Sequence, residues 1–187
     1  MSQFLPKKRE KLSKYLHISE KKCTFVAKSH FLHKYYNYPM AYKASDIAKL
    51  LLQKVQVLGE QSELLTNLKL QKLLYYEQGY HLAYFNTPLF EESIEAWQYG
   101  PVVVSVYDEY KKFGNTGIQI EAMPTISLLP EEQELFDEVF DLYNKYSAIG
   151  LMNMTHAESP WQSAGVPCRG NVISLDAMRT FFKTRLA

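Results

Sequence analysis

Few features of this sequence are typical of secreted, metal-binding or membrane-spanning proteins. Its 187 residues include two cysteines, Cys23 and Cys168, without the C-x-x-C spacing of zinc or redox sites. Such a pair indicates neither a disulfide framework nor a metal centre, and it favours a reducing compartment. No run of about 18 apolar residues occurs, and residues 1–20 lack the apolar centre of a secretory signal. We therefore expect a cytoplasmic protein that uses no membrane, metal ion or other cofactor.

The common catalytic motifs are also missing. The sequence holds no Gly-rich phosphate loop, no H-E-x-x-H zinc motif and no G-x-S-x-G nucleophile elbow. The best candidate for catalysis is "MTHAESPW", residues 154–161, in which His156 could act as a base oriented by Glu158. Thr155 and Glu158 also have the spacing of a helix capping box, and the Ser-Pro pair that follows is typical of a helix start. We favour this structural interpretation and predict that the protein is not an enzyme.

Charge is distributed unevenly along the chain, although the net charge is only +1. Residues 1–39 carry nine Lys and Arg and two acids, whereas residues 40–187 carry twelve Lys and Arg and eighteen acids. Affinity for nucleic-acid backbones depends mainly on clustered cations. Nucleic acid is therefore not the partner that we expect for the acidic residues 40–187.

Charge and periodicity both change at Met40, which predicts a basic N-terminal extension, residues 1–39, followed by a domain, residues 40–187. Three interpretations of the extension stay open. It could be an ordered segment packed on the domain, a basic arm for nucleic acid or a partner, or a translated leader if Met40 is the natural start. A nucleic-acid contact of the arm would use the basic residues Lys7, Lys8, Arg9 and Lys11.

Helical periodicity dominates residues 40–187. Apolar stripes and capping residues predict helices that begin at or next to Ser45, Asn67, Pro101, Pro130, Ser147, Ser159 and Ser174. Short strands are expected at residues 94–99, where apolar and polar residues alternate, and at residues 117–124. The predicted fold class is α+β and predominantly α-helical, a compact helical domain with a small two- or three-stranded β element.

The segment after Asn67 is predicted to be the central helix. Its expected buried face consists of Leu70, Leu73, Leu74, Tyr80, His81 and Tyr84. Glu77 falls on the same face, and an unpaired buried carboxylate is energetically costly. We expect Glu77 to reach a Lys, Arg or Tyr at the edge of this face.

The stretch "EAWQYGPVV", residues 95–103, joins a predicted strand to a predicted helix. The strand is expected to end at Gly100, and Pro101 is expected to open the helix. Trp97 is interpreted either as a core residue or as an anchor exposed to a partner. The chain contains 14 Tyr, 10 Phe and 2 Trp, and Tyr and Trp are favoured anchors of protein interfaces.

Three separated motifs resemble the Panacea domain, also called the SocA-like or GepA-like phage-associated family. They are "LQKLLYY" at residues 70–76, "AW" with "GPV" at residues 96–102, and "TH" with "E" and "PW" at residues 155–161. The resemblance extends from about Ala41 to Leu186. Glu77 departs from it, because such domains often carry a small residue there, and residues 1–39 lie outside it.

The resemblance implies an antitoxin of a bacterial or prophage toxin-antitoxin pair, which binds directly to a toxin encoded by an adjacent gene. One member of the family delivers its toxin to a cellular protease, so blocking and degradation both stay open as modes of neutralisation. Two alternatives are a nucleic-acid-binding regulator that acts through the basic arm and an enzyme that uses His156 and Glu158. The candidate partner-binding residues are Tyr75, Tyr76, Trp97, Tyr99, His156, Glu158 and Trp161.

Overall fold

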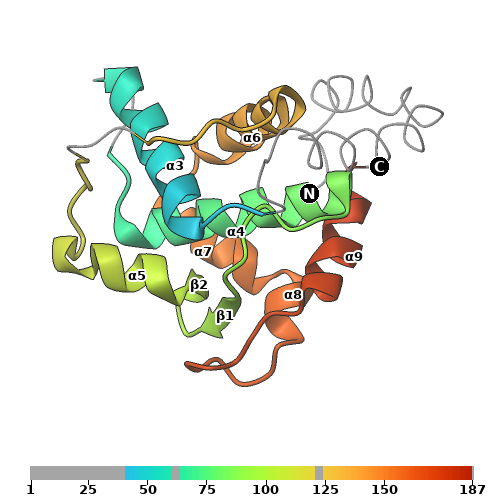
Figure 1. Cartoon of the computed structure of the whole chain (residues 1–187). Helices are drawn as coiled ribbons and strands as arrows, with labels where there is room; N and C mark the ends of the chain where they lie inside the picture. Colours follow the sequence, from blue (N-terminus) through green and yellow to red (C-terminus); the bar gives the residue numbers. More distant parts are fainter. Residues whose placement is uncertain (1–40, 60–63, 121–123, 187) are drawn as a thin grey trace.

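The computed structural model describes residues 41–59, 64–120 and 124–186, which form a mostly helical α+β fold as predicted (Figure 1). The predicted extension, residues 1–39, and Met40 lie outside the described residues. The helices are α3 (Ala44–Leu58), α4 (Asn67–Phe85), α5 (Val104–Tyr110), the 3-10 turn η2 (Lys111–Phe113), α6 (Pro130–Tyr143), α7 (Ala148–His156), α8 (Ser159–Gln162) and α9 (Leu175–Leu186). Two strands, β1 (Ile94–Trp97) and β2 (Gly100–Val103), form an antiparallel hairpin.

Helix α4 runs through the centre of the molecule, with α3, α6, α7 and α9 packed against it (Figure 1). The sequence predicts one buried face, yet every residue from Leu70 to Ala83 is buried. Polar side chains on the other faces are buried because loops supply their partners. The amide group of Gln78, for example, donates to Phe90 O at 2.9 Å and accepts from Leu89 N at 2.7 Å.

Three predicted helix caps, Ser45, Asn67 and Ser159, are wrong by one or two positions. Helix α3 begins at Ala44, so Ser45 lies inside it, and the Glu92 carboxylate accepts the Ala44 N–H at 2.8 Å. Thr66 caps α4 with its side chain, and Asn67 is the first helical residue. An N-terminal N–H group of a helix needs an acceptor, but that acceptor can come from a distant loop that local sequence does not reveal.

The prediction of a helix from Pro101 is also wrong. Residues 100–103 form β2, and α5 begins only at Val104. Gly100 has a φ of +94°, which places the chain in a tight turn after Tyr99 and sends it back along β1. The β-branched Val102 and Val103 suit the resulting strand.

The second predicted strand, at residues 117–124, is not seen: residues 117–120 and 124 form no strand, and residues 121–123 lie outside the described ranges. The free edge of β1 is covered instead by residues 168–173. Ile173 N donates to Ile94 O at 2.8 Å, and Ala96 N donates to Asn171 O at 2.7 Å. This segment satisfies backbone groups that an uncovered edge strand would expose.

The C-terminal helices follow the sequence more closely. Pro130 is the first residue of α6, and Ser147 caps α7 by accepting the Gly150 N–H, as predicted. In α9 the buried Phe182 packs on Gly79 of α4. A Cβ atom at residue 79 would lie 2.1 Å from the Phe182 ring, so the close approach of α9 depends on this glycine.

The predicted capping box before α8 is not present. Thr155 belongs to the last turn of α7, where its hydroxyl donates to Met152 O at 2.8 Å. Glu158 occupies the N-cap position of α8 without a side-chain capping bond, and Ser159 is the first helical residue. Because α8 follows α7 so closely, Thr155 belongs to the last turn of α7 and cannot cap α8.

Glu77 lies within electrostatic reach of Lys54, but Lys54 forms its ion pair with Asp137 instead. The Glu77 side chain is buried, and its Oε1 atom has no hydrogen-bond partner among the described residues. Burial raises the pKa of Glu77 well above its usual range, while the charge of Lys54 lowers it and that of Asp137 raises it. The protonated carboxyl form is therefore favoured at this position.

In the described ranges, no helix combines the length and the apolar character that crossing a membrane requires.

Candidate partner-binding surface

The three motifs meet where the hairpin packs on α4. Lys72 of the first motif is fully buried, and its Nζ atom donates to Pro101 O at 2.8 Å. The neighbouring Gln71 accepts the Val103 N–H at 2.8 Å. Two consecutive side chains of α4 therefore fix both the start and the end of β2.

Gly100 is the point at which all three motifs come into contact. A Cβ atom at this position would lie 2.8 Å from Thr155 Oγ1 and 2.9 Å from Lys72 Cε. Its positive φ already disfavours other residues. Glycine is thus required here both by the backbone conformation and by the close approach of α4 and α7.

Lys72 is buried without an acidic partner among the described residues. Burial lowers its pKa from the usual 10.5 to about 7. A substantial fraction of this amine is therefore neutral at physiological pH, and it serves the hairpin as a hydrogen-bond donor.

Glu158, Tyr75 and Tyr76 lie in the core rather than on the surface. The Tyr76 hydroxyl donates to Glu158 Oε1 at 3.2 Å, and its ring stacks on Tyr143 with centroids 3.7 Å apart. Burial raises the pKa of Glu158 to about 7. Because Tyr75 and Tyr76 are fully buried, they present no area to a partner and instead support the turn between α7 and α8.

The remaining candidates form one aromatic surface, which we name the hairpin surface and define as Trp97, Tyr99, His156 and Trp161. Tyr99 lies in the hairpin turn and is 62% exposed, while the other three residues are half-buried. Trp161 Nε1 donates to Trp97 O at 3.2 Å, and the Trp161 ring stacks on His156 at 4.2 Å. These contacts link β1, α7 and α8 at the surface.

Trp97 is held in a fixed orientation by polar and aromatic neighbours. Its Nε1 atom donates to Glu95 at 2.7 Å, its ring meets Tyr107 edge-on, and Arg169 lies 5.7 Å from the ring centroid. Neither interpretation made from the sequence is complete, since one part of the ring is packed and another is exposed. Such a side chain loses little freedom when a partner covers it.

Glu158 does not orient the His156 ring, as the catalytic interpretation of these two residues requires. Burial lowers the pKa of His156, and the nearby charge of Lys72 lowers it further, so the imidazole is neutral at pH 7. Its Nε2 atom has no hydrogen-bond partner in the described part of the chain, and Glu158 bonds to Tyr76 instead. His156 and Glu158, which the sequence suggested as a base and its orienting carboxylate, therefore form no hydrogen bond with each other in the described part of the chain.

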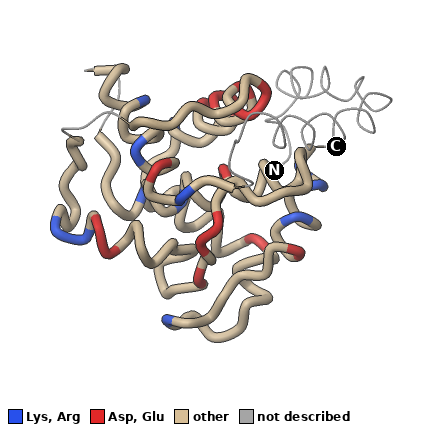
Figure 2. Tube along the Cα trace, in the orientation of Figure 1, with Lys and Arg blue, Asp and Glu red and all other residues tan. Residues whose placement is uncertain are grey.

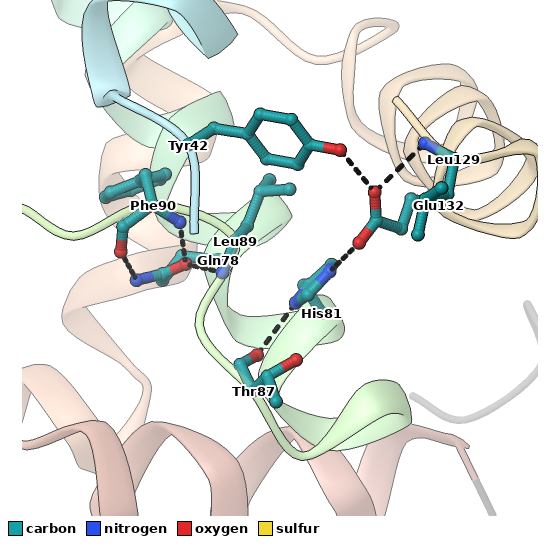
Figure 3. A network of polar contacts seen from close by, with 8 residues as sticks. All are labelled: Tyr42, Gln78, His81, Thr87, Leu89, Phe90, Leu129 and Glu132. Atoms are coloured by element: carbon teal, nitrogen blue, oxygen red, sulfur yellow. Dashed lines mark hydrogen bonds and ion pairs between the residues drawn. The ribbon is translucent and has the colours of Figure 1, made fainter. Parts of the chain in front are cut away.

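A second buried polar network, which the sequence did not reveal, lies at the start of the domain (Figure 3). Glu132 Oε2 accepts from Tyr42 Oη at 2.7 Å and from Leu129 N at 3.1 Å, and Glu132 Oε1 lies 3.4 Å from His81 Nε2. The other ring nitrogen of His81 lies 2.7 Å from Thr87 O. Burial alone would raise the pKa of Glu132, but the bonds from His81 and Tyr42 lower it below its usual value.

This network connects the residues before α3 with α4 and α6. Only His81 was assigned to a buried face from the sequence. The signal that could have identified its partner is the acid at the third position of α6, where a carboxylate can cap the helix start.

Neither a metal site nor the basic arm can be assigned within the described ranges. No group of three or more His, Cys, Asp or Glu side chains there could hold a metal ion. The candidate nucleic-acid contacts Lys7, Lys8, Arg9 and Lys11 lie outside the described residues.

Comparison with known proteins gives the class of this domain. The family model for the "Antitoxin SocA-like, Panacea domain" matches residues 70–162, which include all three motifs. Antitoxin SocA of Caulobacter vibrioides (strain NA1000 / CB15N) is 30% identical over 135 residues, which cover 66% of this chain and 70% of that protein. No solved structure gave a match. The chain belongs to the SocA-like Panacea family.

Proposed function

We propose that this protein is an antitoxin that binds a protein toxin through the hairpin surface. The observation that carries the proposal is the position of Trp97, Tyr99, His156 and Trp161, which are accessible where the three family motifs meet. The buried motif residues then have a structural role, because Lys72 and Gly100 hold the hairpin in place.

The chemistry of the surface suits protein recognition. Trp, Tyr and Arg are the residues most enriched at the energetic centres of interfaces. Here Tyr99 is exposed, the two tryptophans have fixed orientations, and Arg169 borders Trp97. A specific complex usually needs about 800 Å² from each partner, which a domain of this size can supply around these residues.

The proposed toxin is the product of an adjacent gene, and the complex is expected to form in the cytoplasm. Neutralisation can follow from covering the toxin's active site or from delivering the toxin to a cellular protease. The two modes differ in the fate of the toxin, since only the second shortens its lifetime. Neither mode requires catalysis by this chain.

Co-expression tests the proposal directly. The adjacent gene product is expected to stop growth when expressed alone and to be harmless together with this protein. Tyr99→Ala should weaken the rescue, whereas Tyr146→Ala, which truncates a partly exposed tyrosine outside the hairpin surface, should not. Full rescue by a folded Tyr99→Ala, Trp97→Ala double variant would reject this surface.

Two further measurements separate the mechanisms. The half-life of the toxin in cells with and without this protein distinguishes blocking from degradation. His156→Ala should fold and retain some rescue, because a truncated contact weakens binding without abolishing it. A folded His156→Ala variant that binds the toxin with unchanged affinity but gives no rescue would instead support catalysis through this histidine.

A further inference from the structure

The segment that covers the edge of β1, residues 168–173, presents one charged side chain beside the hairpin surface. Residues 163–174, which join α8 to α9, include a single cation, Arg169, and no acid (Figure 2). The Arg169 side chain is 68% exposed, and its Cζ atom lies 5.7 Å from the centroid of the Trp97 ring. Arg169 is therefore accessible and adjacent to a residue of the proposed binding surface.

The chain on both sides of Arg169 is fixed to β1 by hydrogen bonds. On one side, Cys168 N donates to Ala96 O at 2.9 Å. On the other side, Gly170 N donates to Glu95 Oε2 at 2.8 Å. The backbone around Arg169 is thus held in one position before any partner binds, which lowers the entropy that the side chain loses in a complex.

Arg169 has hydrogen-bonding capacity that its neighbours lack. The two indole donors of the hairpin surface are already satisfied, since Trp97 Nε1 donates to Glu95 and Trp161 Nε1 donates to Trp97 O. A guanidinium group carries five N–H donors. Among the described residues, one nitrogen of Arg169, Nη2, has a partner, Asp108 Oδ2 at 3.5 Å. This distance exceeds the usual range of about 2.7–3.2 Å, so the guanidinium can make better bonds to a partner protein.

Asp108 indicates which ligand suits this guanidinium. Its carboxylate approaches Arg169 from α5, but the same carboxylate has a shorter contact with Lys111, whose Nζ atom lies 2.9 Å from Oδ1. Asp108 can therefore keep Lys111 as its partner when Arg169 turns to another carboxylate. A carboxylate from outside can accept two parallel N–H bonds from the guanidinium, an arrangement that is stronger than the single long contact seen here.

The surroundings of Arg169 favour a protein carboxylate over a nucleic-acid phosphate. Phosphate backbones are bound by clustered cations, whereas residues 40–187 carry six more acids than Lys and Arg. The rings of Trp97 and Tyr99 lie in the same surface and can contact the apolar part of a protein segment that carries the acid. Arginine beside tryptophan and tyrosine is also the composition typical of the energetic centre of a protein interface.

We propose that Arg169 binds an Asp or Glu carboxylate of the toxin, and that Asp108 competes for the same guanidinium in the free protein. This inference rests on the proposed function, because it assigns a further contact at the border of the hairpin surface. It makes Arg169 a specificity-determining residue, since a partner without an acid at this contact would cover the guanidinium and leave it poorly paired. It concerns one contact and does not fix the net charge of the toxin.

Isothermal titration calorimetry of the full chain with the purified product of the adjacent gene measures this contact. Arg169→Gln should weaken binding about tenfold or more, because it removes the charge-assisted bonds. Arg169→Lys should recover part of this loss, since lysine keeps the charge but lacks the planar, two-pronged geometry. The matched control is Arg185→Gln on α9, which removes an arginine that lies 4.8 Å from the Phe181 ring centroid. Its affinity should stay within about twofold of wild type.

Asp108 separates binding of a toxin carboxylate from a purely structural role of Arg169. Asp108→Asn removes the competing carboxylate, so it should strengthen toxin binding about two- to fivefold. In an Arg169→Gln background the same substitution should have no effect, because the guanidinium that it releases is absent. If Arg169 only fixed the segment on β1, Asp108→Asn would weaken binding instead.

Two results would overturn the proposal. The first is a folded Arg169→Gln variant with the affinity of wild type. The second is an Asp108→Asn variant that does not strengthen binding, or that strengthens it equally with and without Arg169.

Tyr99→Ala, measured in the same titrations, keeps this inference apart from the proposed function. If Tyr99→Ala weakens binding and Arg169→Gln does not, the hairpin surface stands and the Arg169 contact is wrong. If neither folded variant weakens binding, or if the gene product does not bind the wild-type chain, both proposals are wrong.

Discussion

At the scale of single residues, Gly100 is where backbone conformation and packing act together. Gly170 has a similar positive φ, +90° against +94°, but open space around its Cβ position. The two glycines therefore form a matched pair for substitution by Ala. Either substitution strains the backbone, but only the one at Gly100 also forces side chains apart.

We predict that Gly100→Ala lowers the free energy of unfolding by about 2–5 kcal/mol, as the sum of backbone strain and overpacking against Thr155 and Lys72. Gly170→Ala should lower the free energy of unfolding only by the backbone strain, about 1–2 kcal/mol. Urea unfolding followed by circular dichroism measures both values. Equal losses for the two variants would show that the close approach at Gly100 does not contribute to stability.

Lys72 gives a prediction about pH. Its pKa is about 7 in the folded protein and near 10.4 when unfolded, so the unfolded chain binds the extra proton between these values. Stability from this group therefore rises as pH increases from about 7 towards 10, by at most about 1.4 kcal/mol per pH unit. Lys72→Met should lack this rise.

The measurement is urea unfolding of the wild-type and Lys72→Met proteins at pH 7, 8 and 9. The stability of the variant relative to wild type should fall steadily over this range. Lys183→Met, at an exposed lysine of α9, should differ in stability from wild type by the same amount at each pH. A pH-independent difference for Lys72→Met would mean that Lys72 keeps its proton in the folded state.

At the scale of secondary-structure elements, Glu132 joins three parts of the chain. It accepts hydrogen bonds from Leu129 N at the start of α6 and from Tyr42 before α3, and it faces His81 of α4 (Figure 3). The two ring nitrogens of His81 lie 2.7 Å from Thr87 O and 3.4 Å from Glu132 Oε1, so this ring connects α4 to both the following loop and α6.

We predict that Glu132→Gln lowers the free energy of unfolding by about 2–3 kcal/mol, because a buried charge-assisted network loses its carboxylate. Glu131→Gln, at the exposed neighbour, should change it by less than about 0.5 kcal/mol. Thermal or urea unfolding at pH 7 measures the change in stability for both variants. Similar small effects for both variants would mean that the network does not hold α6 to α4.

The elements also show which parts of the fold were predictable from sequence. Helices α6, α7 and α9 follow from periodicity and from local signals such as Pro130 and Ser147. The hairpin was missed because β2 depends on Gln71 and Lys72, which lie about thirty residues earlier and satisfy its backbone groups from α4. Tertiary partners of this kind override local helix signals such as Pro101.

The site was predictable in part for a similar reason. The motifs identified segments that contact one another in the fold, but no periodicity distinguishes the buried Tyr75 and Tyr76 from the accessible Tyr99 and Trp161. Helix α4 is buried on every face, so its pattern does not show which side chains reach the surface.

At the scale of the whole molecule, the uneven distribution of charge along the chain predicts how fast a partner binds. Residues 40–187 carry six more acids than Lys and Arg. If the toxin presents a basic active site, as a protein that acts on nucleic acid or nucleotides would, the opposite charges should accelerate association.

We predict that the association rate falls by about tenfold or more between about 50 mM and 500 mM salt, while the dissociation rate changes little. Stopped-flow fluorescence of Trp97 and Trp161 in the full chain can follow the reaction. An association rate independent of salt would exclude electrostatic steering by the acidic domain.

The affinity of the purified toxin for variants of the hairpin surface tests the central claim most directly. Isothermal titration calorimetry should show that Tyr99→Ala weakens binding at least tenfold, about 1.4 kcal/mol, while Tyr146→Ala stays within twofold of wild type. Unchanged affinity of a folded Tyr99→Ala, Trp97→Ala double variant would contradict the account.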